Sequence, residues 1–198
     1  MVSIYTLIFL NVLIYVTPAL SSGNYTQLVR FPEDFIARYG FSVPALAEGE
    51  WSRAFSAMFL HGYWFHLLLN MLLLLGVGRI ARQFYRYDSK ILLIYFVCGV
   101  AGFLTHLLYY DDTFRVSIGA SGAILGLFGA LIIPSFVMGH PAYACRLIGV
   151  SLFQLWLDRL LPIVDAAAHL GGLCTGIVLS VGLFSAAHTL VRRPGARS

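Results

Sequence analysis

Long apolar runs dominate this sequence and constrain its fold more than any other feature. Charged or Gly- and Pro-rich stretches separate six such runs, at about 2–20, 58–78, 90–110, 117–137, 143–161 and 166–190. A membrane-spanning helix needs about 20 mostly apolar residues, so each run is long enough to cross a bilayer. Only 11% of the 198 residues are charged, against roughly 25% in soluble domains. We therefore predict an all-α fold, a polytopic membrane protein with a six-transmembrane-helix bundle, and exclude a water-soluble globule.

The segments between the runs leave no room for a large soluble domain. We expect a single membrane domain over 1–198, with a structured or interfacial loop at 21–57 that includes amphipathic stretches such as DFIARYGF. The first run lacks the basic region of a secretory signal, so we expect it to be a retained span. Cys98, Cys145 and Cys174 have neither CxxC nor Cys/His zinc spacing, and we interpret them as small core residues without a redox role.

The charged residues are sorted between the two sides of the membrane. With the N-terminus in the cytoplasm, the inner loops carry eight Lys and Arg against one acidic residue, and the outer loops carry five against eight. The excess of basic residues inside follows the positive-inside rule and predicts that both termini are cytoplasmic. The expected location is a bacterial inner membrane. Asp158 and Asp165 are counted among the outer-loop acids, and no basic tract interleaved with aromatics suggests nucleic acid as a partner.

A few polar residues lie inside the predicted spans, where polar groups are costly and usually face a bundle interior or a water-filled cavity. His66 and Asn70 are four residues apart and share one helical face. Ser121 and His169 lie near the starts of the fourth and sixth spans. All three spans run inward from the outer face, so the four side chains can meet just below it. Each also has a structural interpretation, because a Ser in an apolar helix often bonds to its own backbone and a His at a span end is often interfacial.

Three motifs together resemble the rhomboid family of intramembrane serine proteases. They are HGYWFHLLLN in the second span, GASG at the start of the fourth and AHLGGLCTG in the sixth. The resemblance covers nearly the whole chain and implies six core spans. It implies that Ser121 is the nucleophile and His169 the general base, and that His66 and Asn70 stabilise the oxyanion. Supporting positions implied by the same motifs are His61, Gly119, Gly122, Gly172 and Gly176.

The spaced glycines of the fourth and sixth spans are most simply explained by close helix packing, which would also bring Ser121 near His169. The chain departs from the family pattern in the first loop, where the family's adjacent Trp-Arg is here Trp51-Ser52-Arg53. It departs again at Leu125, where many members have a tyrosine.

The resemblance implies an intramembrane serine endopeptidase that cleaves transmembrane segments of membrane proteins near the outer face. Its partners would be transmembrane protein substrates and the lipid bilayer, and it would need no cofactor and no metal. Because a spanning helix hides its carbonyls in its own hydrogen bonds, we expect substrates that unwind readily near the cut. Asp165 is the only carboxylate that the sequence places near His169, and we interpret it as a helix cap or exposed charge. A Ser–His dyad then carries the chemistry.

Three other classes of protein remain as alternatives. A catalytically inactive rhomboid-like adaptor that binds transmembrane helices is the main rival, although it is expected to lack the Ser or the His. A metalloprotease would use His61, His66 and His169, but no HExxH motif is present. A transporter would need polar groups through the midplane. The motifs fit both a general rhomboid protease and a specialised branch that trims C-terminal sorting anchors.

Overall fold

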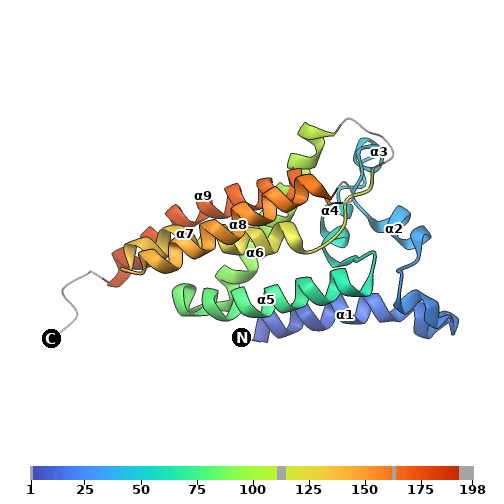
Figure 1. Cartoon of the computed structure of the whole chain (residues 1–198), viewed down its shortest axis with the longest axis horizontal. Helices are drawn as coiled ribbons and strands as arrows, with labels where there is room; N and C mark the ends of the chain where they lie inside the picture. The colour runs from blue at the N-terminus through green and yellow to red at the C-terminus, as the bar shows by residue number, and fades with distance from the viewer. Residues whose placement is uncertain (1, 111–114, 162–163, 192–198) are drawn as a thin grey trace.

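The computed structural model describes residues 2–110, 115–161 and 164–191, and the regular elements in those ranges are helices (Figure 1). Each of the six apolar runs corresponds to one long helix. These are α1 (Val2–Ser22), α5 (Trp64–Tyr85), α6 (Asp88–Tyr109), α7 (Ser121–Val137), α8 (Pro141–Leu160) and α9 (Ala166–Val191). The all-α prediction is therefore confirmed.

Four of these helices, α1, α5, α6 and α9, are long and apolar enough within the described residues to cross a membrane. Helix α7 is apolar but has only 17 residues, and α8 includes charged residues such as Arg146, Asp158 and Arg159. A multi-pass membrane protein follows from the four qualifying helices. The count of six spans stays a prediction for α7 and α8.

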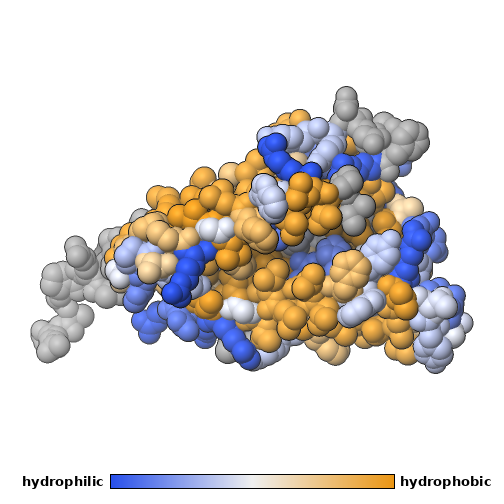
Figure 2. Space-filling view, in the orientation of Figure 1, coloured by the Kyte–Doolittle hydropathy of each residue, from blue (hydrophilic) through white to orange (hydrophobic). Residues whose placement is uncertain are grey.

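Large hydrophobic side chains are exposed along the long helices, as expected for surfaces that face lipid rather than water. Examples are Leu68, Leu69 and Leu72 on α5, Leu152, Phe153 and Trp156 on α8, and Val178 and Val181 on α9. Figure 2 shows hydrophobic residues over the middle of the molecule and hydrophilic ones gathered toward its two ends. The exposed thiols belong to this surface as well. Cys98 is buried, but Cys145 and Cys174 are exposed, so the prediction that all three are core residues was wrong for those two.

Two of the predicted helix starts were too early because the chain is extended there. The run at 58–78 corresponds to α5 at Trp64–Tyr85, since Tyr63 forms an isolated bridge with Arg30 before the helix begins. The run at 117–137 corresponds to α7, which starts only at Ser121. Ser117 pairs with Phe41 through two backbone hydrogen bonds of 2.8 and 3.0 Å. Hydropathy is judged over a stretch of residues, so the apolar runs include Tyr63 and Ser117 although neither is helical.

The segment at 21–57, expected to be a structured or interfacial loop, consists largely of short helices. It contains η1 (Tyr25–Leu28), α2 (Glu33–Tyr39), α3 (Val43–Ala47) and α4 (Arg53–Ser56), and η2 (Ala57–Phe59) follows. The guanidinium of Arg53 donates to the carbonyl of Ala37 at 2.6 Å and pairs with Glu50 at 2.5 Å. Ser56 Oγ donates to the carbonyl of Tyr39 at 2.6 Å. Figure 1 shows α2, α3 and α4 together at one end of the helical bundle.

Helix α7 is the centre of the bundle, and it packs on α5, α6, α8 and most extensively on α9. Glycines make the α7–α9 approach possible: a Cβ at Gly172 would overlap the backbone of Gly122, and a Cβ at Gly176 would overlap the backbone of Gly126. Small residues allow such backbone contact between membrane helices. The interpretation of these glycines as packing positions is therefore confirmed, and it fixes how α7 and α9 lie side by side.

Candidate active site

Ser121 is the first residue of α7 and is partly exposed. The turn that leads to it depends on Gly119, whose φ of +118° is a conformation that L residues rarely adopt. Ala120 precedes the helix and provides no side-chain cap. The first backbone N–H groups of a helix have no partner within it, so the start of α7 presents both a hydroxyl and amide donors at one place.

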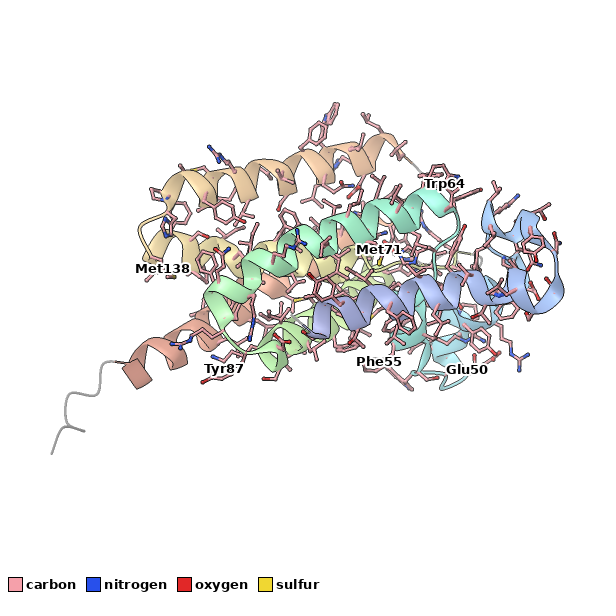
Figure 3. The ribbon with its side chains drawn as sticks, turned by 90° about the horizontal axis from the view of Figure 1, so that it is seen from below. Glu50, Phe55, Trp64, Met71, Tyr87 and Met138 are labelled. Atoms are coloured by element: carbon pink, nitrogen blue, oxygen red, sulfur yellow. The ribbon has the colours of Figure 1, made fainter. Side chains whose placement is uncertain are left out.

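His169 lies in the first turn of α9 and is 5% exposed. Its Nε2 is 2.6 Å from Ser121 Oγ, within hydrogen-bonding distance. In Figure 3, Trp64 at the start of α5 marks the end of the bundle at which α7 and α9 also begin, while Tyr87 and Met138 lie at the opposite end. The Ser and the His that the sequence placed on two separate spans are thus in direct contact.

The other ring nitrogen of His169 contacts a carboxylate that sequence reasoning missed. His169 Nδ1 is 2.7 Å from Oδ2 of Asp158, a residue of α8 that is 3% exposed. The second oxygen, Oδ1, accepts a 2.7 Å hydrogen bond from the Gln154 side chain. Counting Asp158 as an outer-loop charge was wrong, and so was the view of Asp165 as the only carboxylate near His169. The available signal was the spacing of Gln154 and Asp158, which are four residues apart in a largely apolar run and therefore share one helical face.

Asp165 has a different set of partners. Its Oδ1 accepts from the backbone N–H of Ala168 at 3.0 Å, and so it caps the start of α9, as predicted. Its Oδ2 is 2.8 Å from His106 Nδ1 and also accepts a hydrogen bond from Ser117 Oγ. Burial raises the pKa of the Asp165 carboxyl, but these hydrogen bonds from His106, Ser117 and Ala168 outweigh it and hold the pKa below its ordinary value.

The two residues expected to stabilise an oxyanion both lie on α5, and His66 lies close to this pair. A Cβ placed on Gly119 would be 3.2 Å from His66 Nε2 and 3.7 Å from Ser121 Oγ, so both groups border the same glycine. Asn70 is 3% exposed, and its Nδ2 donates to the backbone carbonyl of His66 at 3.0 Å. An amide nitrogen has two protons, so one hydrogen bond to the backbone leaves the second for another acceptor.

His61 supports this region from the connection before α5. It is completely buried, and its ring packs edge-on against the His66 ring at a centroid distance of 4.9 Å. Burial lowers the pKa of His61 well below its ordinary value, and the neighbouring His66 lowers it further. His61 is thus a neutral packing partner for His66.

The described residues contain no group of three or more His, Cys, Asp or Glu side chains arranged to hold a metal ion. The groups present at the site are a hydroxyl, an imidazole, a carboxylate and helix-terminal amides. Together they match the requirements of acyl transfer: a nucleophile, a base in contact with it, and donors near both. The fold and this site define a multi-pass helical membrane protein with a serine–histidine pair near one end of its bundle.

Comparison with known proteins agrees with that class. The family model described as the Rhomboid domain matches residues 48–186, which include all of α5 to α8 and most of α9. The chain belongs to the rhomboid family.

Curated relatives come from both plants and bacteria. The chain is 33% identical to RHOMBOID-like protein 4 of Arabidopsis thaliana over 157 residues. The aligned region is 75% of this chain and 38% of that relative. The chain is 30% identical to Rhomboid protease GluP of Bacillus subtilis, over 70% of this chain and 27% of that protein. The Putative rhomboid protease YdcA of the same bacterium is 31% identical over 74% of this chain and 73% of its own length. The chain therefore spans less than half of several relatives that it matches.

Proposed function

We propose that this protein is an intramembrane serine endopeptidase that cleaves transmembrane segments of other membrane proteins near the outer face of the membrane. The observation that carries the proposal is the 2.6 Å contact between Ser121 Oγ and His169 Nε2. Membership of a family that includes proteins named as proteases supports it. A serine hydroxyl becomes an effective nucleophile when an adjacent base takes its proton, and this contact supplies that base.

The reaction follows from the positions of these groups. Ser121 Oγ attacks a substrate carbonyl carbon while His169 Nε2 takes its proton, and a tetrahedral intermediate forms. His169 then returns the proton to the leaving amine, the C–N bond breaks and an acyl-enzyme remains. A water molecule, activated by the same imidazole, hydrolyses the acyl-enzyme. The partial exposure of Ser121 is consistent with entry of that water.

We expect three groups to stabilise the negative oxygen of the intermediate. They are the His66 ring next to Gly119, the remaining N–H of Asn70, and the backbone N–H groups at the start of α7. Donors placed where charge develops contribute strongly to catalysis, and loss of one typically costs about 2.7–4 kcal/mol. We expect both His66 and Asn70 to contribute to the rate after substrate has bound.

The need of the nucleophile for an accessible carbonyl also limits which substrates can be cleaved. An intact helix offers no free carbonyl to the nucleophile, so substrates should carry Gly, Pro or small residues that let the helix unwind around the cut. Replacement of those residues by Leu in a cleaved substrate should slow cleavage. Equal cleavage of the Leu-substituted substrate would remove this part of the proposal. The proposed location is a bacterial inner membrane, and the distribution of Lys and Arg supports an orientation with both termini in the cytoplasm.

The decisive experiment compares the purified protein in liposomes with Ser121→Ala and His169→Ala, using a generic single-span substrate. Ser135→Ala is the matched control, because Ser135 lies on the same helix but donates to the carbonyl of Leu131 at 2.6 Å within that helix. We expect the two site variants to lose cleavage and the control to retain it. Cleavage by Ser121→Ala at the wild-type rate would refute the proposal. Substrate binding without cleavage by the wild-type protein would favour the rhomboid-like adaptor.

A further inference from the structure

Asp158 is an acidic residue buried in α8 of this membrane protein, and such a residue needs an explanation. Its side chain has no exposed surface, whereas ionisable groups within membrane helices are costly and usually mark a functional site. Both of its oxygens have partners, Oδ2 with His169 and Oδ1 with Gln154. The carboxylate is therefore held in one orientation by His169 and by Gln154 of its own helix.

The contact with Asp158 fixes which nitrogen of His169 carries the proton. A carboxylate only accepts hydrogen bonds, and a neutral imidazole has one donor nitrogen and one acceptor nitrogen. With Nδ1–H donating to Asp158 Oδ2 at 2.7 Å, Nε2 is left as the acceptor that faces Ser121 Oγ at 2.6 Å. This is the tautomer that a general base needs at that position.

We infer that Asp158 is the positioning residue of a Ser121–His169–Asp158 triad: it holds His169 in the catalytic tautomer and stabilises the imidazolium formed when Ser121 attacks. This inference rests on the proposed function, and it replaces the Ser–His dyad expected from the sequence. No further co-reactant is involved. The proton moves from Ser121 to His169 Nε2 and on to the leaving amine, while Nδ1–H stays bonded to the carboxylate.

The other ionisable groups near His169 do not take the place of Asp158. Asp165 lies one turn earlier on the same chain segment, but its oxygens are occupied by His106, Ser117 and the start of α9. His66 approaches from α5 as a second imidazole and brings no negative charge. Among the described residues, Asp158 is the acidic side chain whose carboxylate contacts the His169 ring.

The test uses Asp158→Asn, Asp158→Glu and the wild-type protein in liposomes, with cleavage rates measured across pH. The Asn side chain has nearly the same shape, but its NH₂ can donate to Nδ1 and so favour the opposite tautomer. We expect kcat to fall about 10⁴-fold with little change in KM, as for loss of a triad carboxylate. We expect the pH at which the remaining activity is half-maximal on the acidic side to move to lower pH, because the imidazolium has lost its partner. Asp158→Glu should recover at least part of the rate.

Asp165→Asn is the matched control, because it neutralises a carboxylate that is bonded to a different histidine. It should lower thermal stability but leave the acidic side of the pH profile in place. A purely structural role for Asp158 predicts instead that Asp158→Asn loses stability and that the pH profile of its folded fraction is the same as that of the wild-type protein. That result would overturn the triad.

Covalent labelling by a fluorophosphonate probe gives a second readout that does not depend on the substrate. The probe reacts with an activated serine, so labelling should follow kcat and be abolished in Ser121→Ala. If Asp158→Asn does not fold, the labelling rate of folded Asp158→Glu against wild type carries the test, and an unchanged rate and pH profile would count against positioning. Wild-type rates in Asp158→Asn beside an inactive Ser121→Ala would refute the triad alone. Wild-type labelling of Ser121→Ala would refute the proposed function itself.

Discussion

One of the close backbone contacts between α7 and α9, that of Gly172 with Gly122, lies next to the catalytic candidates, so Gly172→Ala should disturb them directly. A Cβ on Gly172 would be 2.7 Å from the carbonyl carbon of Gly122 and 3.2 Å from its Cα. Carbon atoms in favourable contact are about 3.5–4.0 Å apart. Both partners are helix backbone, so no side-chain rotation can relieve the overlap. The two helices must move apart by about 1 Å to reach that separation.

That movement sets the size of the expected effect. Gly122 follows Ser121 directly, and Gly172 is three residues after His169. A separation of the helices at the two glycines therefore also moves Ser121 away from His169. A displacement of about 1 Å would lengthen the 2.6 Å contact beyond the usual range of a hydrogen bond. Misplacement by about 1 Å can cost about 10²-fold in rate, and overpacking of a core costs about 1–3 kcal/mol. We expect both losses in Gly172→Ala.

The assay measures the initial cleavage rate in liposomes and thermal unfolding in detergent for Gly172→Ala and for Gly182→Ala. Gly182 is on the same helix, is exposed, and has open space where the Cβ would be placed. Its substitution should leave cleavage unchanged and stabilise α9 slightly, by up to about 1 kcal/mol, because Ala is the better helix former. If Gly172→Ala cleaves at the wild-type rate, the glycine contact does not hold the pair together and the reasoning is wrong.

Three further predictions concern stability, each measured by thermal unfolding in detergent. Asp165→Asn should destabilise the protein at pH 7 by about 1–3 kcal/mol and should flatten the stability profile at acid pH. The pKa of Asp165 is held below its ordinary value by His106 and its other donors, so its contribution to stability is present at neutral pH and is lost as pH falls through that pKa. If Asp165→Asn loses as much stability at acid pH as the wild-type protein does, this reasoning is contradicted. His61→Gln should reduce the loss of stability between about pH 7 and 5, because burial lowers the pKa of His61 and the unfolded chain takes up a proton that the folded protein resists. An unchanged slope would show that other groups dominate. Tyr85→Phe should cost about 1 kcal/mol with cleavage unchanged, since the Tyr85 hydroxyl donates to the carbonyl of Ala130 at 2.5 Å; no loss would mean that this bond is replaced in the variant.

Hydropathy predicted the existence of the six long helices well but not where they begin. An apolar run reports low transfer cost to lipid, and both a helix and a buried extended segment meet that condition. The residues before Ser121 are extended because Ser117 pairs with Phe41, more than 70 positions earlier in the chain. A partner at that distance in sequence leaves no periodic signal near Ser117. The positive φ of Gly119 is likewise visible only as a glycine.

The residues of the candidate site likewise fall into two groups, those that a sequence motif predicts and those that only tertiary contacts show. Ser121, His169, His66 and Asn70 were found because each belongs to a short motif of fixed spacing. Asp158 belongs to no such motif, and near a predicted span end it was counted as a charge in contact with water. Its burial depends on how α8 packs against α7 and α9, which charge counting does not describe.

Hydrogen-bond partners separate two kinds of buried polar residue in this bundle. Several buried or half-buried hydroxyl side chains bond to a carbonyl of their own helix, as is usual for an isolated Ser or Thr in an apolar helix. They are Thr105 to Ala101, Ser135 to Leu131 and Ser180 to Ile177. The polar contacts that join side chains of different elements include Ser121–His169–Asp158 and His106–Asp165–Ser117. Both lie at the starts of α7 and α9.

This separation bears on where chemistry can occur. A polar group bonded to its own helix is satisfied before the helices assemble and adds little to their specificity. A group bonded across helices has its partner only in the folded bundle, so its geometry is set by the same packing that brings Gly122 and Gly172 together. Hydrolysis needs both fixed groups and access for water. The end of the bundle that holds the cross-helix contacts also holds the partly exposed Ser121, and so it meets both requirements at one place.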